Sequence, residues 1–97
     1  MESRKHKQLA EKLAGIKGTE YHDDKGVDIR TATQAIEVEV DANALGEAKK
    51  QLAGTTKTPY IAVPPEIRKE ALEETEGTRI GVMGPTAKIY KRGRSKK

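Results

Sequence analysis

The strongest constraint on the fold is a pair of apolar segments joined by a helical one. Residues 35–40 alternate apolar and polar side chains, which is typical of a strand. Residues 59–63 are almost entirely apolar, which indicates a strand buried on both faces. Between them, residues 42–53 carry apolar side chains at helical spacing, and Gly54 ends that segment. Such a strand–helix–strand unit requires a right-handed crossover and parallel pairing.

Short elements are predicted on either side of this unit, because Gly and Pro interrupt the chain at short intervals. They are helices over residues 3–15 and 66–76, and strands over residues 21–23, 27–31, 79–83 and 87–90. The hairpin-length connections in the first half favour antiparallel pairing. The predicted order is therefore α-β-β-β-α-β-α-β-β. We expect an α/β fold with a mixed central sheet flanked by helices.

The composition narrows the class of protein further. The chain has 97 residues, enough for one small domain, which we place at residues 1–90. It has no Cys, Phe or Trp, so the core must be built from Leu, Ile, Val and Ala. The absence of cysteine excludes disulfides, thiolate metal sites and a thiol nucleophile. The sequence shows no apolar run of membrane-spanning length and no signal-peptide pattern, so we expect a soluble cytoplasmic protein.

Charge is distributed unevenly along the chain. Residues 1–17 carry a net charge of +3, residues 18–87 carry −5, and residues 88–97 carry +6. Basic segments suit contacts with a phosphate backbone, although a merely solubilising tail is the alternative. We expect residues 91–97 to form a disordered basic tail. The candidate nucleic-acid contacts at this end are Lys88, Lys91, Arg92, Arg94, Lys96 and Lys97.

Acidic residues occupy one face of the predicted hairpin. Strand alternation puts Glu37, Glu39 and Asp41 on the same face, opposite the apolar residues between them. Asp28, on the preceding strand, points the same way and can lie beside Glu37. Neighbouring carboxylates repel one another unless they reach water, meet basic residues or bind a hard cation such as Mg²⁺. A solvated polar sheet face is the simpler alternative.

Four segments in this order resemble the PD-(D/E)xK nuclease superfamily, which has the restriction-endonuclease-like fold and includes Holliday-junction resolvases. They are residues 26–29 (Gly-Val-Asp-Ile), residues 35–40 (Ala-Ile-Glu-Val-Glu-Val), the Gln51-Leu52 pair and residues 59–63 (Pro-Tyr-Ile-Ala-Val). The core order of that fold, α-β-β-β-α-β, is similar to the predicted order over residues 3–63. The resemblance covers about two-thirds of the chain.

This resemblance implies a metal site. Asp28 matches the aspartate that opens the second strand and binds metal, and Glu37 matches the acidic residue of the (D/E)xK segment. Val38 would contribute its backbone carbonyl. The implied cofactor is Mg²⁺ or Mn²⁺, with one or two ions left open.

The main departure is Glu39, which stands where the family usually has lysine. Some members carry glutamate there and use it as a base or as a metal ligand, whereas others no longer cut. In other members the lysine comes from the following helix, so Lys49 or Lys50 would replace it here. Gln51 on that helix and His6 on the first helix are further supporting candidates.

The expected function is metal-dependent hydrolysis of phosphodiester bonds in DNA, with Glu39 accepting a proton from water. One alternative is a catalytically inactive nucleic-acid-binding or regulatory module on the same fold. Another is a protein-interaction domain whose acidic face binds a basic partner. So small a chain has little room for a recognition domain, so a homodimer or a recruiting partner would fit.

Overall fold

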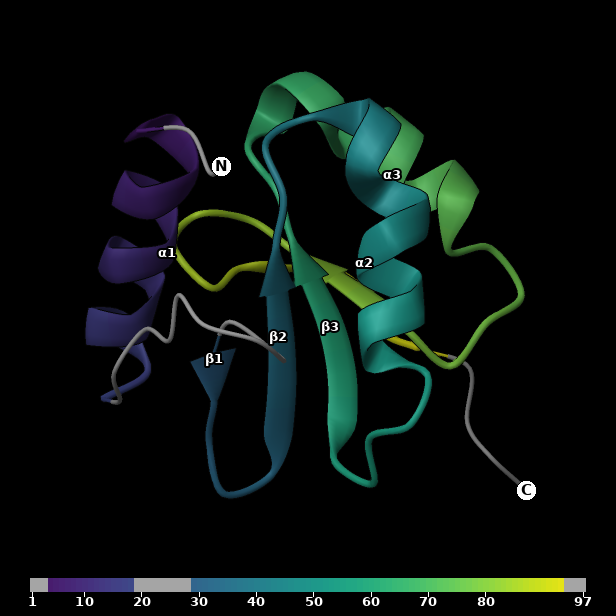
Figure 1. The fold of residues 1–97 in the computed structure, drawn as a ribbon, viewed down its shortest axis with the longest axis horizontal. Coiled ribbons are helices and arrows are strands. Elements are labelled where there is room, and N and C mark those ends of the chain that lie inside the picture. The colour runs from purple at the N-terminus through teal and green to yellow at the C-terminus, as the bar shows by residue number, and fades with distance from the viewer. Residues whose placement is uncertain (1–3, 19–28, 94–97) are drawn as a thin grey trace.

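The computed structural model describes residues 4–18 and 29–93 (Figure 1). Within them the helices and strands are α1 (Arg4–Ile16), β1 (Ile29–Arg30), β2 (Gln34–Val38), α2 (Leu45–Leu52), β3 (Thr58–Ala62), α3 (Arg68–Glu74), β4 (Gly81–Met83) and β5 (Ile89–Lys91). Short 3-10 turns, η1 (Ala42–Ala44) and η2 (Pro65–Ile67), precede α2 and α3. The α/β prediction is confirmed, and the observed order roughly matches the predicted one. The strand predicted over residues 21–23 lies outside the described residues.

The described strands form one sheet in the order β1-β2-β3-β4-β5. The outer pairs, β1–β2 and β4–β5, are antiparallel, whereas β2–β3 and β3–β4 are parallel. The parallel pairing predicted around residues 42–53 is therefore confirmed. Both parallel connections step the same way across the sheet, so right-handed crossovers put α2 and α3 on one face. Figure 1 shows these two helices together, with α1 across the sheet from them.

Alternate strand residues divide between two apolar layers. Under α1, one layer contains Leu13, Ile36 and Tyr60. Under α2 and α3, the other contains Leu52 and Ile61. Both faces of β3 are therefore buried, which explains why its sequence is an uninterrupted apolar run rather than an alternating one.

Local hydrogen bonds and one glycine stabilise the ends of the helices and turns. The Asp41 carboxylate accepts a hydrogen bond from the Asn43 amide at 2.9 Å and so caps η1. Gly77, which follows α3, has a φ of 78°, a conformation that favours glycine. The Arg79 guanidinium donates to the carbonyls of Leu52 and Ala53 at the end of α2, and to that of Thr55 in the following loop at 2.8 Å. No helix in the described part of the chain is long and apolar enough to cross a membrane.

Candidate functional site

Glu37 is a carboxylate inside an aliphatic layer. It lies in β2 on the same face as Ala35, and its register partner in β3 is Ile61. Only 7% of its surface is exposed, and its Oε2 atom is buried. The solvent-facing alternative is therefore wrong for Glu37, because α2 and α3 cover the face that it shares. Burying a carboxylate among aliphatic side chains is costly, which sets Glu37 apart from the other residues of this layer.

The other two acids of the predicted face lie in different surroundings. Glu39 follows the end of β2 and is half-buried, and its amide donates to the Ala62 carbonyl at 3.0 Å. Asp41 is exposed and serves as the cap of η1. Only Glu37 therefore lies within the layer, with Glu39 at its rim.

The predicted metal ligands are described only in part. Asp28 lies outside the described residues, whereas Glu37 and Val38 occupy the last two positions of β2. Within residues 4–18 and 29–93, no three histidine, aspartate or glutamate side chains form a group that could hold a metal ion. A carboxylate and a backbone carbonyl are the oxygen donors that Mg²⁺ prefers, so the donor chemistry fits. A metal site here would need Asp28 to complete it.

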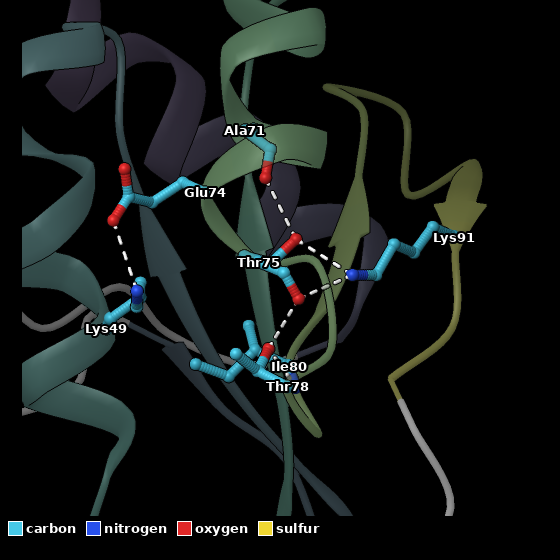
Figure 2. Close-up of polar contacts among 7 residues, drawn as sticks. All are labelled: Lys49, Ala71, Glu74, Thr75, Thr78, Ile80 and Lys91. Carbon is cyan, nitrogen blue, oxygen red and sulfur yellow. Dashed lines mark hydrogen bonds and ion pairs between the residues drawn. The ribbon is translucent and has the colours of Figure 1, made fainter.

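The predicted supporting residues on α2 are partly or fully exposed. The Lys49 ammonium lies 3.1 Å from the Glu74 carboxylate of α3, as Figure 2 shows. Both side chains are substantially exposed, so the pair ties α2 to α3 only weakly. Lys50 and Gln51 are exposed. Lys49 is therefore paired with Glu74 of α3.

His6 lies on the other side of the sheet from Glu37. It is half-buried on α1, whose apolar residues Leu9 and Leu13 pack with Ile36. Because Ile36 and Glu37 are adjacent in β2, their side chains point to opposite faces. The sheet therefore separates His6 from the Glu37 carboxylate.

Lys91 is part of the folded domain. It ends β5, and its ammonium donates to the Thr75 carbonyl at 2.6 Å and to the Thr75 hydroxyl at 3.1 Å (Figure 2). This contact holds a cation at the carboxyl end of α3, where the helix dipole favours it. The ordered domain therefore extends beyond residue 90. Of the other predicted phosphate contacts, Lys88 and Arg92 are exposed, whereas those outside the described residues are Arg94, Lys96 and Lys97.

Replacing the Thr75 hydroxyl tests the contact between Thr75 and Lys91. Thr75 is fully buried, and its hydroxyl donates to the Ala71 carbonyl at 2.8 Å while accepting from Lys91. Thr75→Val keeps the shape but removes both bonds, so we expect the free energy of unfolding to fall by about 1–2 kcal/mol. Urea denaturation measures this, with the exposed Thr58→Val as the matched control. Equal midpoints for the two variants would contradict the expectation.

A cation–π pair joins the start of α3 to β5. The Arg68 guanidinium lies over the Tyr90 ring, 5.2 Å from its centroid. Arg68 is exposed and Tyr90 is half-buried. Sequence reasoning missed this pair, because the two residues lie on different elements and no periodicity connects them.

A polar pocket of about 420 Å³ lies between α2 and α3. It is lined by Ala42, Asn43, Leu45, Glu70, Glu73 and Glu74. The three glutamates would repel a phosphate, so this pocket is unsuited to a nucleic-acid backbone.

The chain was also compared with known proteins. No family model, curated protein or solved structure matches it. A function must therefore be argued from the residues of the chain and their arrangement.

Proposed function

We propose that the chain is a PD-(D/E)xK-type nuclease domain acting on DNA. Asp28, Glu37 and the Val38 carbonyl would hold Mg²⁺ or Mn²⁺. The observation that carries the proposal is the burial of Glu37 at the carboxyl end of a strand that pairs in parallel with β3. Ligand sites in α/β sheets favour this end of the strands.

The β1–β2 register supports this choice of residues. Ile29 pairs with Ile36, and Arg30 pairs with Ala35, in an antiparallel ladder. The proposal requires the ladder to continue by one pair, which joins Asp28 to Glu37. Directly opposite residues have Cβ atoms about 4.5–5.5 Å apart, close enough for two carboxylates to share one cation.

Each acidic residue would have a separate role in phosphodiester hydrolysis. A divalent ion held by the two carboxylates would polarise the phosphate and lower the pKa of a bound water. Glu39, which is half-buried at the rim, would accept the proton of the attacking water. The helices that cover the face of Glu37 keep bulk water away from its carboxylate, which strengthens its electrostatic interactions.

The structure also favours a second candidate, an inactive nucleic-acid-binding module on the same fold. Position 39 holds glutamate, and Lys49 is paired with Glu74. A site without a lysine binds a metal ion but has less positive charge for stabilising the transition state. This candidate predicts metal and DNA binding without cleavage.

The first test is a Mn²⁺ titration followed by paramagnetic broadening of backbone amides. We expect broadening centred on Asp28 and on residues 37–39, and its loss in Glu37→Gln. Glu47→Gln removes an exposed carboxylate from α2 and should leave the broadening unchanged. Broadening spread evenly over the acidic residues would refute the metal site.

Cleavage of linear, branched and single-stranded DNA is the second test. Because a bound metal contributes several kcal/mol to such reactions, Glu37→Gln and Asp28→Ala should each lower the cleavage rate at least about a hundredfold. Glu47→Gln should cut at the wild-type rate. If the wild type binds Mn²⁺ and DNA but does not cut, the protein is the inactive nucleic-acid-binding module.

A further inference from the structure

The carboxyl ends of the parallel strands, the first residue of α3 and the start of β5 all lie at one end of the sheet. The parallel strands β2, β3 and β4 all end there, and α3 begins there directly after β3 and η2 (Figure 1). Arg68 is the first residue of α3, so it lies at the same end of the sheet as Glu37. The antiparallel strand β5 starts at this end as well, and the exposed Lys88 immediately precedes it.

The tyrosine beneath Arg68 is fixed by close packing. The Tyr90 hydroxyl approaches Gly84 so closely that a Cβ at position 84 would lie 2.5 Å from it. Tyr90 therefore presents its ring in a defined position, with the Arg68 guanidinium above it. A guanidinium stacked on an aromatic ring is oriented in advance while its N–H groups stay available, and these groups suit phosphate oxygens.

Charges on α3 are separated between its two flanks. The flank toward α2 carries glutamates, since Glu74 pairs with Lys49 and Glu70 and Glu73 line the neighbouring pocket. The flank toward β5 carries Arg68, which stacks on Tyr90. A phosphate near Arg68 would therefore be attracted, whereas one entering the pocket between α2 and α3 would be repelled.

We propose that Arg68, oriented by Tyr90 and assisted by Lys88, contacts a backbone phosphate of the DNA strand bound at Glu37. This inference rests on the proposed function. Strands β2 and β5 are separated by three strand spacings, or about 14 Å, so the contact falls on a phosphate away from the scissile one. It would position the DNA without reading its sequence.

The test measures binding separately from cleavage. Fluorescence anisotropy of a labelled DNA duplex in EDTA gives the dissociation constant as a function of salt. Arg68→Ala should weaken binding about fivefold and reduce the slope of log K against log salt by about 0.9, the value for one phosphate contact. Lys12→Ala removes one positive charge from an exposed site on α1, across the sheet, and should change neither quantity.

Two variants of the tyrosine separate stacking from charge. Tyr90→Phe keeps the ring and should bind like the wild type, whereas Tyr90→Leu should lose part of the affinity that Arg68→Ala loses. Equal weakening by Arg68→Ala and Lys12→Ala would show a nonspecific charge effect and overturn the inference. It would also be overturned if Arg68→Ala bound like the wild type, although the metal site would then still stand. A wild-type protein that binds no DNA, either in EDTA or with Mn²⁺ present, would overturn both.

Discussion

Replacing Ile61 with alanine is expected to lower the free energy of unfolding by about 3–4 kcal/mol. Ile61 is fully buried in β3, the central strand of the sheet, with Glu37 beside it in β2 and Val82 beside it in β4. Paired strands on both sides prevent the surroundings from closing around the missing atoms, so a cavity remains. A domain of this size should lose at least about 12 °C in Tm.

Thermal and urea denaturation measure this loss, and Ile16→Ala is the matched control. Ile16 ends α1 and is 50% exposed, so its truncation should change the free energy of unfolding by less than about 0.5 kcal/mol. Similar effects of the two substitutions would contradict the central position of β3 in the sheet.

Gly81→Ala is expected to destabilise the protein by about 2–3 kcal/mol, because the added methyl group has no space. A Cβ at position 81 would overlap the Tyr60 ring at Cε1 and would lie 2.9 Å from the Lys91 carbonyl oxygen. Tyr60 is almost fully buried on the α1 side of the sheet, and the carbonyl belongs to β5, so neither neighbour can withdraw freely.

A control of opposite sign is available at Gly46 in α2. A Cβ there meets nothing within 4 Å, so Gly46→Ala should stabilise the protein by about 0.5–1 kcal/mol through helix propensity. The double variant Gly81→Ala/Tyr60→Leu should be more stable than the sum of its single effects predicts, because the clash is shared. Additive effects would mean that the methyl group does not meet the tyrosine ring.

The sheet face of Glu37 could be predicted from the sequence, whereas the burial of that face could not. Alternation along residues 35–40 correctly put Glu37 on the face opposite Ile36 and Val38. It did not show that this second face is buried, because an alternating strand is compatible with either water or a helix on its polar side. That outcome depended on the direction of two crossovers, which place α2 and α3 over the same face.

Contacts between residues far apart in the chain also could not be predicted from the sequence. Lys91 was expected in a tail, but its ammonium meets a threonine at the end of α3. Lys49 was a candidate partner of the carboxylates, but it pairs with Glu74. The partner of each lysine depends on how the elements pack against one another. The spacing of residues within one element does not contain this information.

Within the described residues, the sequence by itself determined the approximate order of the elements and the parallel pairing of the central strands. Side-chain periodicity is a local property, and a strand–helix–strand connection has one strongly favoured hand. Only the tertiary structure decided which surfaces became interior, placing a carboxylate in an aliphatic layer and an arginine over a tyrosine at one end of the sheet. Burial and stacking arise when elements far apart in the chain pack together, so they follow from the arrangement of the elements rather than from the elements themselves.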